Sequence, residues 1–143
     1  MKKIMIINGP NLAALGKRET HIYGTETLDD IIAYTRKKTS ELNVEIEARQ
    51  TNSESAIIDY LYEAKGKGFD GIVLNAAAYS HYSIAIRDAI ASVMLPCVEV
   101  HLSNIFARDE FRAKSVISAV CIGVISGFGK NVYAMGIDAL CNM

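Results

Sequence analysis

The chain has few cysteines and no long apolar run. Its 143 residues include only three cysteines, Cys97, Cys121 and Cys141, which is an odd number without Cys-x-x-Cys spacing. This scarcity argues against a disulfide framework and a zinc site, and it favours a reducing, cytoplasmic compartment. No apolar stretch approaches the length that spans a bilayer, and the run after Lys2 and Lys3 is too short for a signal peptide.

The chain also has no excess of charge of either sign. Lys and Arg number 15 against 16 Asp and Glu, so the formal net charge is -1, and neither sign forms a long run. Nucleic acid and anionic membranes are therefore not expected as partners. With 143 residues, 50% of them hydrophobic, the chain has enough apolar material for one core. We expect a single domain over residues 1–143.

Several common site motifs are absent as well. No Gly-x-Gly-x-x-Gly follows the first apolar run, and residues 127–130 lack the spacing of a phosphate-binding P-loop. There is no Gly-x-Ser-x-Gly nucleophile elbow. A response-regulator module would need an Asp at the position of Asn75. No cluster of His, Cys and carboxylate residues has metal-ligand spacing, so we expect no metal and no other cofactor.

Apolar runs alternate along the chain with amphipathic segments. Continuous apolar runs predict buried strands at residues 4–7, 72–74, 97–101 and 120–125. Residues 44–49 alternate apolar and polar side chains, which is typical of an edge strand. Segments with helical periodicity predict helices that begin near Thr27, Ser53, Ser83 and Asn131.

This alternation predicts a parallel sheet with helices on both faces, because each parallel connection needs a crossover. Right-handed crossovers and five strands favour a doubly wound, flavodoxin-like α/β fold of strand order 2-1-3-4-5, with the alternating strand at an edge. Ligands of such sheets bind outside the carboxyl ends of the strands, at the switch point between the first and third strands. The segments that follow Asn8, Asn75 and His101 should therefore line one crevice.

The loop after the first strand is one candidate wall of this crevice. Two glycines and a proline interrupt its first half, and Arg18 and Tyr23 lie close together on it. An isolated tyrosine, with a pKa of about 10, is a poor base near neutrality, but an adjacent guanidinium favours the phenolate. The pair could therefore form a base, although surface loops also carry Arg and Tyr without any catalytic role.

Histidines and one carboxylate supply the other candidate groups. His21 lies in the opening loop, His81 follows the third strand and His101 ends the fourth. Glu99 interrupts that fourth strand two residues earlier, on the same side as His101, so its carboxylate can fix the tautomer of the imidazole. A carboxylate in a buried strand needs such a partner. Satisfied structural histidines are the simpler alternative, but a carboxylate-oriented histidine at a strand end favours acid–base chemistry.

Five separated motifs resemble those of the type II 3-dehydroquinate dehydratase family, in register over essentially the whole chain. They are N-G-P-N-L with L-G-x-R-E and Y-G in residues 8–24, N-A-A-A-Y-S-H at 75–81, I-R-D-A-I at 86–90, E-V-H-L-S-N at 99–104 and A-R-D-E-F-R at 107–112. The resemblance implies a cofactor-independent hydro-lyase of the shikimate pathway. Its reaction would be the anti elimination of water from 3-dehydroquinate through an enolate to give 3-dehydroshikimate.

The resemblance also implies individual catalytic roles. Tyr23 would remove a proton from C2, next to the ketone, and Arg18 would keep it ionised with Arg108 in support. His101, oriented by Glu99, would protonate the departing C1 hydroxyl. A water held by Asn11 would stabilise the enolate.

The substrate-binding residues follow from the same resemblance. The backbone N–H groups of Leu102 and Ser103 would hold the substrate carboxylate, and Asp88 would reach the site of a neighbouring subunit. The full set implied in binding is Asn75, His81, Asp88, Leu102, Ser103 and Arg112. The expected assembly is a homo-oligomer, a dodecamer built from trimers.

The chain departs from the family pattern at a few positions. Ala13 stands where a polar residue is usual, Thr20 where Pro often follows Arg-Glu, Asp109 for Glu and Ser80 for Thr. Ala13 and Thr20 lie in the opening loop and bear on loop closure and rate more than on reaction type, whereas Asp109 is a conservative change and Ser80 keeps the hydroxyl. Two alternatives remain, namely a homologue that binds a related ring acid without turnover, and a non-catalytic flavodoxin-like binding or signalling module that would retain a nucleotide or flavin.

Overall fold

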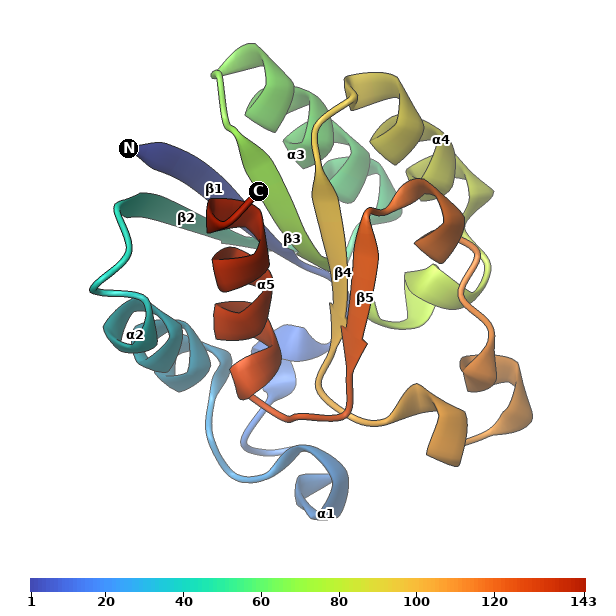
Figure 1. Cartoon of the computed structure of the whole chain (residues 1–143). Helices are drawn as coiled ribbons and strands as arrows, with labels where there is room; N and C mark the ends of the chain where they lie inside the picture. The colour runs from blue at the N-terminus through green and yellow to red at the C-terminus, as the bar shows by residue number, and fades with distance from the viewer.

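Five strands form one parallel sheet of order β2-β1-β3-β4-β5 in the computed structural model, which describes residues 1–143 (Figure 1). All four strand pairs are parallel, so the predicted flavodoxin-like order is confirmed. The strands are β1 Lys2–Asn8, β2 Val44–Gln50, β3 Gly71–Asn75, β4 Cys97–His101 and β5 Gly123–Ser126.

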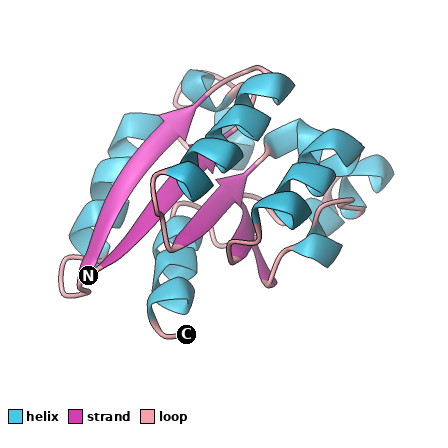
Figure 2. Cartoon of the chain, turned by 90° about the horizontal axis from the view of Figure 1, so that it is seen from above, coloured by secondary structure: helices cyan, strands magenta, loops and turns pink.

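Helices cover both faces of this sheet (Figure 2). Helices α3 and α4 pack together on one face, and α2 and α5 pack together on the other. The helices are α1 Thr20–Tyr23, α2 Leu28–Lys38, α3 Glu54–Gly66, α4 Ile84–Val93 and α5 Asn131–Cys141. Short 3₁₀ helices are η1 Leu12–Ala14, η2 Ala77–His81, η3 Ile105–Ala107, η4 Glu110–Ala113 and η5 Ser118–Val120. None of these helices is long and apolar enough to cross a membrane.

The predicted helix starts have a local cause in their caps. The Thr27 hydroxyl accepts from the Asp30 N–H while the Asp30 carboxylate accepts from the Thr27 N–H, which is a reciprocal capping box. Ser53 and Ser83 cap α3 and α4 with their hydroxyls alone. Each hydroxyl accepts from a backbone N–H three residues further along the chain. These bonds satisfy donors that the first helical turn leaves free.

Two apolar cores lie on the two faces of the sheet, and alternate residues of β1 enter each. Met5 and Ile7 pack with α3 and α4, whereas Ile4 and Ile6 pack with α2 and α5. All four side chains are buried, because β1 has a helical layer on both sides. The continuous apolar run of β1 is therefore a consequence of its central place in the sheet.

The last strand, predicted over residues 120–125, is present as β5, but its start was predicted three residues too early. Strand β5 begins at Gly123, and the 3₁₀ helix η5 ends at Val120. Ile122 and Val124 are exposed, since β5 is an edge strand that the rest of this chain does not cover. An apolar run in the sequence indicates that its side chains are buried, but it does not show which element, or which molecule, packs against them.

Candidate active site

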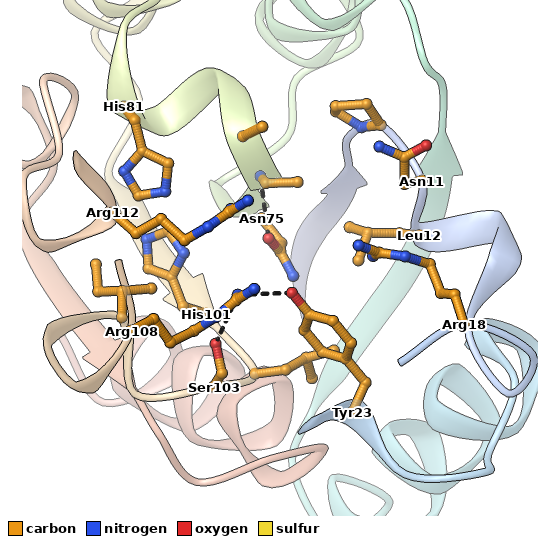
Figure 3. Close-up of a pocket in the computed structure, with 15 residues that line it drawn as sticks. Asn11, Leu12, Arg18, Tyr23, Asn75, His81, His101, Ser103, Arg108 and Arg112 are labelled. Carbon is orange, nitrogen blue, oxygen red and sulfur yellow. Dashed lines mark hydrogen bonds between the residues drawn. The ribbon is translucent and has the colours of Figure 1, made fainter. Parts of the chain in front are cut away.

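A pocket opens at the carboxyl ends of β1, β3 and β4, where the sequence predicts a crevice (Figure 3). Figure 1 shows the chain termini at the opposite end of the sheet from α1. The pocket is lined by Pro10, Asn11, Leu12, Arg18, Tyr23, Asn75, Ala77, Ala78, His81, His101, Leu102, Ser103, Ile105, Arg108 and Arg112. Ten of the predicted site residues are therefore brought together from segments far apart in the sequence.

Two other predicted residues lie outside this lining. Glu99 is fully buried behind His101. Asp88 is exposed on α4 and does not line the pocket of its own chain. His21, which we expected near the site, is an exposed residue of α1 and does not line the pocket either.

Asn75 is fixed by a network at the ends of β1 and β3. Its side-chain N–H donates to the Tyr133 hydroxyl at 3.0 Å, and its Oδ1 accepts from the Ala77 N–H at 3.2 Å. Tyr133 in turn donates to Asn8 Oδ1 at 2.6 Å. Burial raises the pKa of Tyr133, so its hydroxyl keeps the proton that this network needs. Tyr133 was not predicted as part of the site, although a tyrosine among the apolar residues of α5 is a signal of a buried polar contact.

Gly9 allows the two loops above this network to approach closely. A Cβ atom at Gly9 would lie 2.7 Å from the backbone oxygen of Ala76. The Gly9 N–H donates to the Asn75 oxygen at 2.8 Å. The glycine of the Asn-Gly-Pro-Asn-Leu motif is therefore required by backbone packing.

The Tyr23 hydroxyl lies among guanidinium groups. Arg108 donates to the Tyr23 oxygen at 2.7 Å and contacts the Ser103 hydroxyl at 3.3 Å. The Arg18 guanidinium lies 4.9 Å from the centre of the Tyr23 ring and pairs with Glu19 at 2.8 Å. The direct hydrogen bond to the phenol oxygen thus comes from Arg108, which the sequence suggested only as support, and Arg18 packs against the ring.

His101 is oriented by Glu99, as predicted. The imidazole Nε2 lies 2.5 Å from Glu99 Oε2, and the other carboxylate oxygen accepts from the Ser118 hydroxyl at 2.5 Å. Burial acts to raise the pKa of Glu99, but the hydrogen bonds from His101 and Ser118 outweigh it and lower the pKa. Glu99 is therefore a carboxylate acceptor, which assigns the Nε2 proton to His101. Ser118 was not predicted as part of the site, because nothing in the sequence relates it to a strand residue 19 positions earlier.

His81 stacks on His101, with ring centroids 6.3 Å apart and an interplanar angle of 22°. Its Nδ1 lies 2.7 Å from the backbone oxygen of Lys114. Because a carbonyl only accepts, Nδ1 carries a proton, which leaves Nε2 free of a protein partner. Arg112, next to His81 in Figure 3, pairs with Asp109 at 3.3 Å.

Positive charge predominates on the pocket wall. Three guanidinium groups line it, from Arg18, Arg108 and Arg112, and no carboxylate does. The backbone N–H groups of Leu102 and Ser103 donate to no other protein group. Such a wall suits a small anionic ligand, with guanidinium and N–H donors for a carboxylate. No group of three or more His, Cys, Asp or Glu residues is placed to hold a metal ion.

The positions that depart from the family pattern are compatible with the fold. Thr20 is the first residue of α1, the helical position at which Pro is well tolerated, so either residue fits there. Ala13 is exposed in η1, and Asp109 still reaches Arg112. The buried Ser80 hydroxyl has no hydrogen-bond partner.

Comparison with known proteins gives one consistent family. The family description "dehydroquinase class II" matches residues 2–141. A 3-dehydroquinate dehydratase of Pelodictyon phaeoclathratiforme is 55% identical over 141 residues, which cover 98% of this chain and 92% of that protein. One of Clostridium perfringens is 52% identical over 138 residues, with 96% and 94% covered.

Solved structures agree with this result. The type II dehydroquinase of Butyrivibrio crossotus has a TM-score of 0.94 and 49% identity, with 97% of both chains covered. A 3-dehydroquinate dehydratase-like protein of Bifidobacterium longum is more distant, with a TM-score of 0.72 and 28% identity over 99% of this chain and 97% of that one.

Proposed function

Because the chain belongs to the class II dehydroquinase family, we propose that it dehydrates 3-dehydroquinate to 3-dehydroshikimate by anti elimination, through an enolate and without a cofactor. The observation that carries this mechanism is the pairing of two groups in one cationic pocket. One is a tyrosine whose oxygen accepts from a guanidinium, and the other is a histidine bound to a buried carboxylate. The proposed catalytic unit is a single domain of residues 1–143.

Proton removal is the first step. The C2–H bond is acidified by the neighbouring ketone, and the Tyr23 phenolate takes this proton while the carbonyl becomes an enolate. The Arg108 guanidinium stabilises the phenolate form by donating to its oxygen, and Arg18 adds positive charge beside the ring. Asn11, whose side chain does not cap η1, is free to hold a water against the enolate oxygen.

Loss of the hydroxyl is the second step. As the enolate reforms the ketone, its carbon–carbon electron pair forms the C1=C2 double bond and the C1–O bond breaks. Protonated His101 donates a proton to the departing oxygen, so the hydroxyl leaves as water. Glu99 stabilises the imidazolium before this transfer and holds the ring in one orientation. Tyr23 ends protonated and His101 neutral, and proton exchange with solvent restores both groups.

The remaining lining residues bind the substrate in this proposal. The free N–H groups of Leu102 and Ser103 receive the carboxylate. Asn75, His81 and Arg112 bind the ring hydroxyls from the other walls. The fixed amide of Asn75 and the fixed tautomer of His81 make these contacts specific in direction.

The protein is further proposed to be a homo-oligomer, a dodecamer built from trimers, that acts in the cytoplasm. Exposed apolar side chains gather on the uncovered edge strand β5, on the loop residues that flank it, and on η3 and α5. They are Phe106, Ile122, Val124, Phe128 and Met135. An exposed apolar strand edge is unfavourable in a monomer, and a second copy of the chain would cover it. Asp88, exposed and outside its own pocket, is free to reach a neighbouring site.

A direct assay tests the activity. Purified protein with no added cofactor should convert 3-dehydroquinate to the conjugated enone, followed as rising ultraviolet absorbance, and a chelator should leave the rate unchanged. No absorbance change with fresh substrate at neutral pH would contradict the activity. Substrate binding without turnover would indicate a homologue that has lost catalysis, and a purified protein that carries flavin or nucleotide absorbance would favour the binding module.

A further inference from the structure

One short stretch behind the pocket binds one pocket histidine, His81, directly and binds Glu99, the partner of the other, His101. We call residues 114–118 the anchor segment. The Lys114 oxygen accepts from His81 Nδ1 at 2.7 Å. At the other end of the segment, the Ser118 hydroxyl donates to Glu99 Oε1 at 2.5 Å, and Glu99 Oε2 binds His101 Nε2 at 2.5 Å. The two stacked imidazoles are thus oriented from the same segment.

The anchor segment is itself held in place at its centre. The Val116 N–H donates to the Ser80 oxygen at 2.8 Å, and the Val116 oxygen accepts from Arg87 at 3.1 Å. Ile117 is fully buried in the core formed with α3 and α4. These contacts fix the segment against η2 and α4, so the Ser118 hydroxyl is presented to Glu99 from a rigid support.

We propose that Ser118 is a positioning residue for His101, acting through Glu99. This inference rests on the proposed function, because it concerns the group that donates the proton to the leaving hydroxyl. A glutamate carboxylate that is hydrogen-bonded through one oxygen can still rotate about its Cγ–Cδ bond. Hydrogen bonds to both oxygens define the plane of the carboxylate. The Ser118 bond therefore fixes the plane of Glu99, and Glu99 fixes the direction of the His101 ring.

Few other titratable groups lie around Glu99, so loss of the Ser118 hydrogen bond should be measurable as a change in the pH at which Glu99 is protonated. On β4 the titratable neighbours are His101 and Cys97, and the pKa of Cys97 is raised by its contact with Cys121 and by burial, so it stays a neutral thiol. The residues paired with Glu99 on the adjacent strands, Leu74 and Val124, are apolar. The Ser118 bond helps to lower the pKa of Glu99, so its loss raises that pKa and moves protonation of Glu99 to higher pH.

The test compares Ser118→Ala with a matched control, Ser83→Ala. Ser83 also donates to a carboxylate, Glu54, at 2.6 Å, but this pair lies outside the pocket. Ser118→Ala should lower kcat about tenfold with little change in KM, and it should move the acidic limb of the kcat profile to higher pH. Ser118→Thr, which keeps the hydroxyl, should restore both. Ser83→Ala should lose stability but keep the pH profile.

A second readout needs no turnover. In protein with ¹⁵N-labelled histidine, the Nε2–H signal of His101 should move in Ser118→Ala and stay in place in Ser83→Ala. An unchanged signal and an unchanged profile in Ser118→Ala would overturn the proposal, and so would an equal shift in both variants. If Ser118→Ala does not fold, Ser118→Cys, a weaker donor, should show the same changes to a smaller extent. An inactive wild-type protein would contradict the proposed function, while the histidine signal would still decide the role of Ser118.

Discussion

The hydroxyl of Tyr23 accepts a hydrogen bond from a guanidinium, whereas the Tyr34 hydroxyl donates to the Asn131 amide. A guanidinium partner favours the phenolate, and an amide oxygen favours the neutral phenol. The Tyr23→Phe variant should therefore lose about 10²–10⁴-fold in kcat and still bind substrate, because the phenolate is the proposed base. Turnover and calorimetric binding measure the two effects. Tyr34→Phe is the matched control and should keep its turnover; an active Tyr23→Phe would remove Tyr23 from the mechanism.

Tyr133 has a structural role that follows from complete burial. Its hydroxyl donates to Asn8 Oδ1 and accepts from Asn75 Nδ2, so Tyr133→Phe removes the hydrogen bond of one buried atom in each of the two amides. We expect the free energy of unfolding to fall by about 1–3 kcal/mol, measured by denaturant titration. Tyr62→Phe, which removes an exposed bond to Ser92, should change stability much less. Equal losses of unfolding free energy in the two variants would contradict a larger contribution of the buried network to stability.

Glu99 links the site to stability at low pH. Its pKa is lowered in the folded protein from the ordinary value of 4.5, so its ionisation stabilises the fold above pH 4.5, and this contribution is lost as pH falls through the lower folded pKa. The stability difference between wild type and Glu99→Gln should therefore shrink below pH 4.5. Asp30 and Glu63 also have lowered pKa values, but they titrate in both proteins and cancel in the difference. A difference that stays constant between pH 6 and pH 3 would contradict this assignment.

Among the elements, the turns after β1 and β3 depend on one glycine. Gly9→Ala would place a Cβ atom 2.7 Å from the Ala76 backbone oxygen, so the two loops must separate. We expect a loss of about 1–3 kcal/mol in stability and weaker substrate binding, since Asn11 lies on the first of these loops and Asn75 ends the strand before the second. Gly66→Ala meets nothing within 4 Å in α3 and should stabilise the protein by up to about 1 kcal/mol. Thermal unfolding of both variants checks the pair, and a stable Gly9→Ala would contradict the close packing.

The elements also show what the sequence can and cannot predict. The apolar run of β1 and the N-cap at Thr27 are local features, and both predicted their elements correctly. The pairing of Glu99 with His101 was also predictable, since residues two apart in a strand share a face. Ser118 and Tyr133 reach the site from other elements. A tyrosine among the apolar residues of α5 signals a buried polar contact, but no local pattern says which residues Tyr133 or Ser118 will bind. The start of β5 was predicted too early, because an apolar run does not show where a strand begins or what covers it.

For the whole molecule, the proposed oligomer gives a measurable mass. The chain has a mass of 15.6 kDa, and light scattering should give about twelve times this value if the dodecamer forms. Val124→Glu places a charge on the exposed apolar edge and should lower the mass. Tyr62→Glu, at an exposed site on α3 away from this edge, should keep the mass of the wild type. A monomeric wild type would contradict the assembly.

The central claim is that base and acid act on opposite faces of one substrate, and isotope labelling at C2 tests it most directly. Two samples of 3-dehydroquinate would each carry one deuterium at C2, either anti or syn to the C1 hydroxyl. Mass spectrometry of the 3-dehydroshikimate formed should show the anti deuterium lost and the syn deuterium retained. Retention of the anti deuterium, with loss of the syn deuterium, would contradict anti elimination by Tyr23 and His101.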